Sequence, residues 1–402
     1  MSHRRSLHRV ACGLVLAACS SNHEGAPDAG NPPQMDAPPD TGWAEAHHPS
    51  QPVVSSGGGN VLTAPVVVPV FFANDKDAQT QVESFLPMMA QSPYWMAITQ
   101  EYGVGALTIA PTVIATETPP TTDDALQTIV DSHTNGTGGW PANTPNTIYA
   151  VFLPEGVTLT AGGTSCVDFG GYHAETNNNT VYALLPRCSS MNYPGLEYLT
   201  IATSHEVLEA STDPHPYSNP AYNQVDDDDA ILSLLPGGEL GDMCEMARAV
   251  YQPMVGSFYV QRTWSNASAA AGHDPCVPVL TTPYVEAAAN LPDIMVDGGG
   301  QQFTTRGVQV PNGMSKTVEV DLYSDAPTAD WTVVAYDVAS QYNMSSPELQ
   351  LTLDRSTGNN GDKLNLTIQR IAPASEFGVS EFVLFSQVNG VNTGMWFGLV
   401  SQ

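Results

Sequence analysis

Residues 200–214 constrain the fold of this chain more than any other stretch, and they read Thr-Ile-Ala-Thr-Ser-His-Glu-Val-Leu-Glu-Ala-Ser-Thr-Asp-Pro. The stretch predicts a helix that ends at Asp213, because proline disfavours helical geometry in the residue before it. His205 and Glu209 are four residues apart and therefore share one face of that helix, with Glu206 beside them. Most neighbouring residues are apolar, which predicts a buried helix whose charged side chains require partners or a metal ion.

The spacing of these three residues is that of the His-Glu-x-x-His sequence of zinc peptidases, with glutamate in place of the second histidine. Imidazole and carboxylate groups both bind zinc, so His205 and Glu209 are candidate ligands. Glu206 is then placed to accept a proton from a metal-bound water, which makes it the candidate catalytic residue. The alternative is that one histidine and two glutamates form a solvated helix face.

A second acidic stretch, Gly-Gly-Glu-Leu-Gly-Asp-Met-Cys-Glu at 237–245, supplies candidates for a third ligand. Glu239 is the first choice. Asp242 would either orient the His205 ring through a hydrogen bond or replace Glu239 as a ligand. His215 follows His205 by ten residues and ranks lower, because the glycine that this longer spacing requires is absent. The competing interpretation of the stretch is a glycine turn that ends at a disulfide cysteine.

Five segments form one wider pattern, at 169–173, 181–184, 204–214, 238–244 and 260–266. This pattern resembles the EXORDIUM or phosphate-induced protein family of plant cell walls and its bacterial relatives, over roughly residues 61–280. The resemblance implies an extracellular protein and implies no particular enzymatic activity. A long leader and an additional C-terminal region distinguish this chain from the plant members.

The N-terminus has the features of an export signal. Three arginines precede a short apolar run at 10–18, which is too short to span a bilayer. Leu-Ala-Ala-Cys at 16–19 has the form of a bacterial lipobox, which predicts a signal peptide over residues 1–18 and lipidation of Cys19. An ordinary secretory signal cut near Ala18 is the alternative. We expect a protein anchored by lipid in the outer membrane or at the cell surface of a bacterium.

The chain is strongly acidic, with a formal net charge of −29 at pH 7. Removal of residues 1–18 takes away three arginines and no acid, so the net charge of −29 becomes −32. Such a field disfavours nucleic acid and anionic lipid as partners, and the lipid anchor is the only membrane contact that we expect. Residues 19–59 are rich in Pro, Gly, Asp and Ser, which predicts a disordered tether behind the anchor.

Cysteine usage agrees with export. Cys166, Cys188, Cys244 and Cys276 lie beyond the N-terminal region, and four cysteines in an exported chain indicate two disulfides. Three pairings are possible, and closeness in the sequence favours Cys166–Cys188 and Cys244–Cys276. No Cys-x-x-Cys spacing occurs, which argues against a zinc ion held by four cysteines.

Residues 60–280 alternate apolar runs with helical patterns. Strands are expected at 66–72, 147–153 and 181–185, with helices between the first two and the helix of His205 after the third. This order predicts a zincin-like α+β domain, in which helices back a mixed sheet and one helix carries the site. His173 is interpreted as a structural loop histidine. Four consecutive aspartates at 226–229 raise the possibility of Ca²⁺, but they lack the alternating spacing of a calcium loop.

Residues 281–402 alternate apolar and polar positions, as in Val318, Val320 and Leu322, which predicts strands. Asn389-Gly390 between two apolar runs predicts a hairpin turn. About seven such strands are expected, and they fit an all-β sandwich without a catalytic constellation.

Two functional hypotheses follow. The first is an exported lipoprotein with a zinc-dependent, peptidase-like hydrolase domain that acts on a peptide. The second is a non-catalytic surface protein with a degenerate metallopeptidase fold, which binds a cell-wall polymer or a protein partner. One imidazole and two carboxylates would leave a neutral zinc centre, which is a weaker Lewis acid than a site with two histidines.

Overall fold

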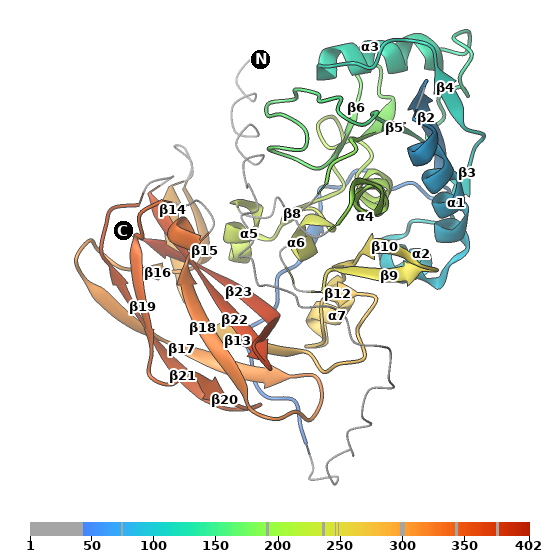
Figure 1. Cartoon of the computed structure of the whole chain (residues 1–402). Helices are drawn as coiled ribbons and strands as arrows, with labels where there is room; N and C mark the ends of the chain where they lie inside the picture. Colours follow the sequence, from blue (N-terminus) through green and yellow to red (C-terminus); the bar gives the residue numbers. More distant parts are fainter. Residues whose placement is uncertain are drawn as a thin grey trace.

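The computed structural model describes residues 43–402 except 74, 190–192, 235–237, 246, 248, 298–301, 342–344 and 375–377. The signal peptide, Cys19 and the first part of the expected tether lie outside these residues. Figure 1 shows a lobe of mixed helices and strands followed by a β-rich lobe, with α5, α6 and β8 on the side of the first lobe that faces the second. No helix in the described part of the chain is long and apolar enough to cross a membrane.

The first lobe is built on a six-stranded sheet in the order β3-β2-β5-β7-β6, with β4 also paired to β2. All these pairings are parallel except that of β6, which runs antiparallel to β7 at the edge. The central strands are almost entirely apolar and buried, as parallel strands covered on both faces require. The strands are β2 (Val66–Phe72), β3 (Thr108–Ile109), β4 (Val113–Ala115), β5 (Thr147–Phe152), β6 (Tyr172–Glu175) and β7 (Val181–Leu185).

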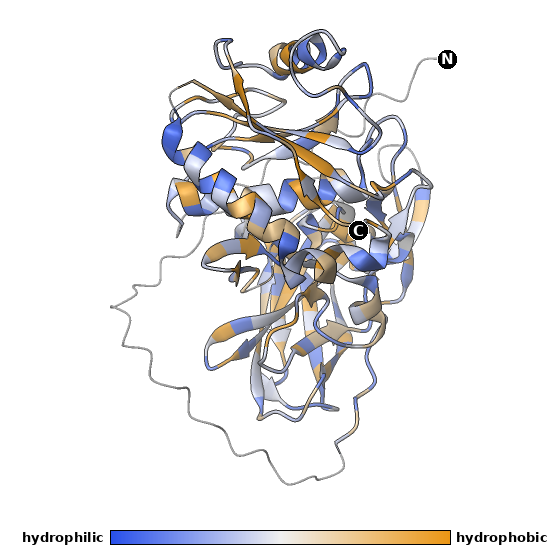
Figure 2. Cartoon of the chain, turned by 90° about the vertical axis from the view of Figure 1, so that its right-hand side faces the viewer, coloured by the Kyte–Doolittle hydropathy of each residue, from blue (hydrophilic) through white to orange (hydrophobic). Residues whose placement is uncertain are grey.

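Helices cover both faces of this sheet. Ile148 and Ala150 of β5 face a core that contains α1 (Lys76–Gln91), α2 (Pro93–Thr99) and α4 (Gly195–Thr212). Tyr149 and Val151, which alternate with them, face the core under α3 (Asp123–Thr134). Figure 2 shows the resulting run of hydrophobic residues along the strands. The lobe is therefore a mixed α/β structure, with the α4 helix packed on one face of the sheet.

The rest of the first lobe consists of short elements, among which β10 packs against α4. They are η1 (Gln100–Tyr102), β8 (Tyr222–Val225), η2 (Asp227–Asp229), α5 (Ala230–Leu234), α6 (Asp242–Glu245), β9 (Tyr251–Val255), β10 (Phe258–Gln261), β11 (Thr263–Trp264), α7 (Asn266–Ala270) and β12 (Cys276–Val277). Two disulfides, Cys166–Cys188 and Cys244–Cys276, confirm the predicted pairing. The second of them ties α6 to β12.

In its described residues, the second lobe consists of strands and one short helix, α8 (Val338–Gln341). One sheet has the order β13-β17-β21-β19 and the other β16-β23-β22-β18-β20, and they share a buried core, as expected of a sandwich. Asn389 and Gly390 both have positive φ angles at the β22–β23 turn, which confirms the predicted hairpin. The strands are β13 (Val285–Ala289), β14 (Asp293–Asp297), β15 (Gln302–Arg306), β16 (Val308–Gln309), β17 (Ser315–Ser324), β18 (Trp331–Asp337), β19 (Leu349–Leu353), β20 (Thr357–Gly358), β21 (Lys363–Arg370), β22 (Val379–Val388) and β23 (Val391–Ser401).

The tether prediction is wrong for its last part, because residues 43–59 are folded against both lobes. Strand β1 (Val54–Ser56) pairs antiparallel with β8, and the side chain of Val54 is 1% exposed. His48 stacks on Tyr323 of the second lobe with ring centroids 4.0 Å apart. A composition poor in aliphatic residues did not reveal this, since one buried valine and side-chain contacts suffice to hold a segment onto existing surfaces.

Aspartates of the run at 226–229 help to join the two lobes. Asp229 pairs with Arg306 of β15, and the Asp228 carbonyl accepts a hydrogen bond from Thr305 Oγ1 at 3.1 Å. Asp226 accepts the backbone N–H of Val53 at 3.0 Å. The carboxylates of Asp226 and Asp229 also interact with each other, and neither residue belongs to a candidate ligand group among the described residues.

Candidate metal centre

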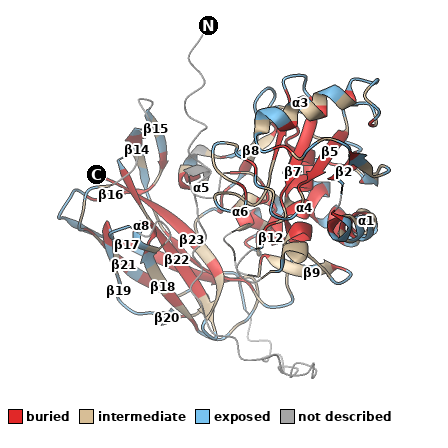
Figure 3. Ribbon diagram, turned by 45° about the horizontal axis from the view of Figure 1, so that its top comes forward, coloured by how far each residue is buried: buried red, intermediate tan, exposed pale blue. Residues whose placement is uncertain are grey.

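The helix α4 is buried around nearly its whole circumference, which brings its charged residues into the interior. It runs from Gly195 to Thr212 with Asp213 as its C-cap, so the predicted end is confirmed and the start lies five residues earlier. Figure 3 shows α4 as a largely buried element beside the strands of the sheet. Glu206 and Glu209 are 5% and 2% exposed. Carboxylates at this depth need hydrogen bonds, cations or protons.

His205 lies on α4, and its ring faces side chains from α6 and β10. Its Nε2 lies 2.9 Å from Glu209 Oε2 and 3.6 Å from Asp242 Oδ1. Its Nδ1 lies 3.0 Å from Gln261 Oε1, and the Gln261 amide donates in turn to the Gly241 carbonyl at 2.7 Å. That donation fixes the amide so that its oxygen faces the ring, and Nδ1 therefore carries the proton. Nε2 donates to Glu209, and although burial opposes protonation, Glu209 and Glu206 raise the pKa of His205 well above its ordinary value. Release of the Nε2 proton to a metal ion would leave the Nε2 lone pair facing two carboxylates.

Glu209 is anchored through its other oxygen. Oε1 accepts the backbone N–H groups of Gly241 at 3.0 Å and Asp242 at 3.2 Å. A Cβ atom at position 241 would lie 2.7 Å from Glu209 Oε1 and 2.8 Å from His205 Nδ1. Only glycine allows the backbone to approach both side chains this closely, which explains the glycine in this turn.

Of the two candidates for the third ligand, it is Asp242, and not the first choice Glu239, that lies beside His205. His205, Glu209 and Asp242 have ligand atoms within 4.8 Å of one another, whereas Glu239 belongs to a different group, with His173 and Asp213. Gln261, rather than Asp242, orients the His205 ring. The turn after Gly238 thus reaches α4, where Asp242, the alternative ligand, lies beside His205 and Glu239 lies beside His173.

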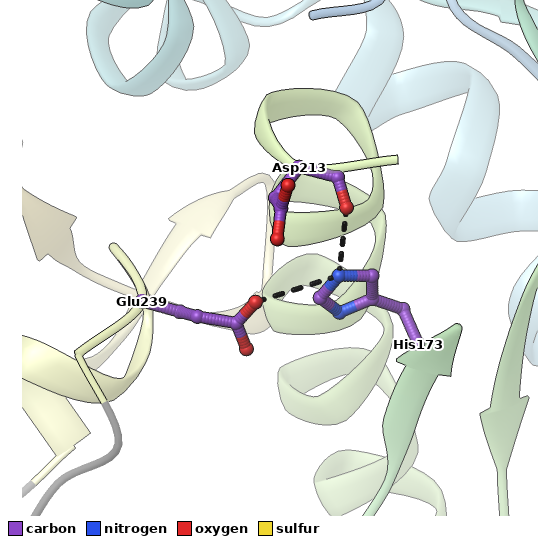
Figure 4. A group of neighbouring side chains, drawn as sticks. All are labelled: His173, Asp213 and Glu239. Atoms are coloured by element: carbon purple, nitrogen blue, oxygen red, sulfur yellow. Dashed lines mark hydrogen bonds and ion pairs between the residues drawn. The ribbon is translucent and has the colours of Figure 1, made fainter. Parts of the chain in front are cut away.

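His173 is the residue that sequence reasoning underestimated. It lies on β6 and is buried, not in a loop. Its Nε2 is 3.0 Å from the Asp213 carbonyl oxygen and 3.6 Å from Glu239 Oε1. Figure 4 shows the three residues and marks both contacts. Its Nδ1 faces Glu209 Oε2 at 3.7 Å and Glu206 Oε2 at 3.8 Å. The signal available in the sequence was the Gly170-Gly171 pair, whose small size admits a close neighbour just before the strand.

Glu206 is the least satisfied member of the cluster. Its side chain is 6% exposed, and Oε2 has no hydrogen-bond partner within the described residues. A Cβ atom at position 171 would lie 2.7 Å from its other oxygen, Oε1. An unsatisfied buried carboxylate oxygen costs about 1–3 kcal/mol or more, so the protein carries a penalty here that a cation would remove.

The electrostatics of the cluster show more negative charge than the histidines can balance. Burial opposes protonation of His173, yet Glu239 and its neighbours raise the pKa of that ring to about 10. Burial and then Glu209 raise the pKa of Glu239 to about 8 and the pKa of Asp242 well above its ordinary value. Burial also raises the pKa of Glu206. The metal-free cluster therefore retains protons that a divalent cation would displace.

His215 does not enter the cluster. It is half-buried, its Nδ1 has no hydrogen-bond partner in the described structure, and it belongs to none of the three candidate ligand groups. The residues present fit a hard or borderline divalent ion, because the available ligand atoms are imidazole nitrogens and carboxylate oxygens. The set at His205, Glu209 and Asp242 combines anchored ligands with a partly open side, where Asp242 and Glu239 are 21% and 22% exposed.

Comparisons with known proteins add little to this geometry. No family model matches the chain, and no curated protein matches it. A solved structure that matches is a conjugative transposon lipoprotein from Bacteroides eggerthii, at 13% identity, with 31% of this chain and 100% of that chain covered. Its TM-score is 0.19, which is too low to indicate a shared fold.

Proposed function

We propose that this chain is an exported protein that holds zinc at His205, Glu209 and Asp242 and uses it to hydrolyse a peptide-like substrate. The observation that carries the proposal is the His205 ring, which is fixed through Nδ1 by Gln261 while Nε2 faces two carboxylates. Metal-binding histidines are held in this way, with the far nitrogen donating to an oxygen. Structural salt bridges alone do not require that second contact.

The residues have separate tasks in this proposal. Zinc bound here would acidify a bound water and polarise a carbonyl group. Gln261 holds the His205 ring, and the backbone of the 241–242 turn holds Glu209. Glu206 would accept the proton, since it follows His205 on α4 and a carboxylate oxygen of its side chain has no hydrogen-bond partner in the described structure. The partly exposed side at Asp242 and Glu239 would be the route for substrate.

Export and anchoring belong to the same proposal. The basic start, the apolar run and the Leu-Ala-Ala-Cys sequence support a lipidated Cys19. Two disulfides support an oxidising compartment. The resemblance to the EXORDIUM family and the zincin-like interpretation of the first lobe also stay proposals, supported by the five segments and by a site helix packed on a mixed sheet.

Metal content and hydrolysis test the two halves of the proposal separately. Wild type should retain zinc after dialysis, Glu209→Ala should lose it, and Glu206→Gln should keep zinc at the His205 position and lose hydrolysis of casein. His215→Ala is the matched control, because that half-buried histidine lies outside every ligand group, and it should keep both zinc and activity. Wild type that is folded and free of zinc after zinc has been supplied would overturn the proposal.

A second candidate is a structural metal site in a non-catalytic surface protein, which would bind a cell-wall polymer or a protein partner. The burial of Glu206, with a side chain that is 6% exposed, favours it, because a proton acceptor must reach the reacting water. This candidate predicts that removal of zinc lowers the unfolding temperature while wild type, loaded with zinc, hydrolyses no peptide substrate.

A further inference from the structure

His173 is held in the same way as His205, but through the opposite ring nitrogen. Its Nε2 lies 3.0 Å from the Asp213 carbonyl, which can only accept a hydrogen bond, so Nε2 carries a proton. The lone pair of the neutral ring is then on Nδ1, which points toward Glu206 and Glu209. Figure 4 shows the Nε2 side of the ring directed at Asp213 and Glu239.

The atoms around Nδ1 are spaced for a cation rather than for hydrogen bonds. Nδ1 lies 3.7 Å from Glu209 Oε2 and 3.8 Å from Glu206 Oε2, which is longer than a hydrogen bond. Zinc ligands at bond lengths of about 2.1 Å in a tetrahedron lie roughly 3.4 Å from one another, so a small contraction would close this set on an ion. The Glu206 oxygen in the set is the buried one without a partner.

This set is distinct from the one at His205, although the two are joined. Among the described residues, His173 groups with Glu206 and Glu209, and His205 groups with Glu209 and Asp242, but no group contains both histidines. One ion therefore does not reach both rings in this arrangement. Glu209 is common to the two groups, and its Oε2 lies 2.9 Å from His205 Nε2 and 3.7 Å from His173 Nδ1.

We propose that the cluster holds a second divalent metal ion, at His173 Nδ1, Glu206 and Glu209, with Glu209 bridging it to the ion at His205. The proposal rests on the metal-binding part of the proposed function and not on its hydrolytic step. With the second ion bound, Glu206 Oε2 is a ligand and only Oε1 remains to accept a proton. The supply of ligands favours two ions, because five carboxyl groups have an oxygen within 4.8 Å of a ring nitrogen of His173 or His205: Glu206, Glu209, Asp213, Glu239 and Asp242.

A rival position for the second ion lies on the other side of the same ring, at Nε2 with Glu239 and Asp213. There the carbonyl of Asp213 already accepts the proton of Nε2, so an ion would have to displace that hydrogen bond. The carboxylate oxygens that face Nδ1 lie farther away, at 3.7 and 3.8 Å, and the Glu206 oxygen among them has no hydrogen-bond partner in the described structure. The two positions make opposite predictions for the number of ions bound after substitution of Glu206 and of Glu239, which lie on either side of one histidine.

The experiment is zinc titration of the chelator-treated, full mature protein by calorimetry, with bound zinc counted by elemental analysis. We expect two zinc ions per wild-type chain, one in His173→Ala, one in Glu206→Gln and two in Glu239→Gln. Circular dichroism reports whether each variant is folded, and Glu206→Gln decides the matter if His173→Ala does not fold, because it conserves shape.

The outcomes separate the two proposals. One ion in wild type and still one in Glu206→Gln would overturn the second position and leave the site at His205 intact. No ion in wild type would overturn both. Two ions in Glu206→Gln together with one in Glu239→Gln would place the second ion at Nε2 and contradict the assignment made here.

Discussion

At the scale of the residue, two glycines set the spacing of the cluster. Gly241 brings its backbone against Glu209 and His205, and Gly171 leaves room beside Glu206. The His205–Glu209 pair could be predicted from the sequence because helical periodicity places the two on one face. Gln261 could not be predicted, because it reaches His205 from a strand more than fifty residues away and amides carry no distinctive spacing.

Gly241→Ala should weaken zinc binding by about 10- to 100-fold, the usual cost of disturbing the residues that hold metal ligands. The added Cβ would collide with Glu209 Oε1 and His205 Nδ1, and the backbone would have to withdraw. Gly195→Ala is the matched control at the start of the same helix, where the nearest atom is an ordinary 3.4 Å away. Calorimetric titration measures both, and equal affinities in the two variants would contradict this account of Gly241.

At the scale of the element, α4 could be predicted almost completely, and its surroundings only in part. Its apolar sequence and the proline after Asp213 mark a buried helix and its end. Strands β2, β5 and β7 follow from their apolar runs. Strands β3 and β11 have two residues each and helix α6 has four, which is too short for a hydrophobic periodicity. The position of Asp242 on α6 relative to His205 depends on tertiary packing, so it could not be predicted from the sequence.

Loss of the Cys244–Cys276 disulfide should weaken zinc binding as well as stability. Cys244 lies on α6 two residues after Asp242, and the bridge holds that short helix to β12. The double variant Cys244→Ser/Cys276→Ser should lose about 2–4 kcal/mol of unfolding free energy, from the chain entropy that the bridge removes, together with zinc affinity. Cys166→Ser/Cys188→Ser should lose comparable stability, but its folded form should keep the ion at His205. Urea unfolding and zinc titration of both pairs test this, and unchanged zinc affinity in the first pair would refute the role given to α6.

At the scale of the whole molecule, the two lobes meet through both polar and apolar residues. The N-terminal segment 43–59 lies at the same boundary. Ile231 of α5 packs into a cluster of second-lobe residues, and a cavity of about 60 Å³ lies nearby with Arg262, Asp274 and Glu286 in its lining. The sandwich could be predicted from alternation along its longer strands. The contacts between lobes could not, because they depend on single residues such as Asp229 in stretches that look solvated.

Glu286 at this boundary should make stability depend on pH. Burial raises its pKa to about 7, against the hydrogen bonds from Tyr284 and two backbone N–H groups that lower it. The folded state binds the proton more tightly than the unfolded state, so the contribution of Glu286 falls by about 3 kcal/mol as pH rises from about 4.5 to about 7.

Glu286→Gln should remove this part of the pH dependence, because the amide does not titrate. The test is the difference in unfolding free energy between wild type and variant at several pH values, in which other titrating groups cancel. A difference that stays constant from pH 4.5 to 7 would show that Glu286 titrates alike in the folded and unfolded states.

The central claim is that the acidic cluster on α4 is a metal centre, and anomalous diffraction from crystals grown with zinc tests it most directly. The account predicts an anomalous peak about 2.0–2.2 Å from His205 Nε2 and from a carboxylate oxygen of Glu209, with Asp242 turned toward it. A well-ordered cluster without a peak, in which His205 remains hydrogen-bonded directly to Glu209 despite the added zinc, would contradict it.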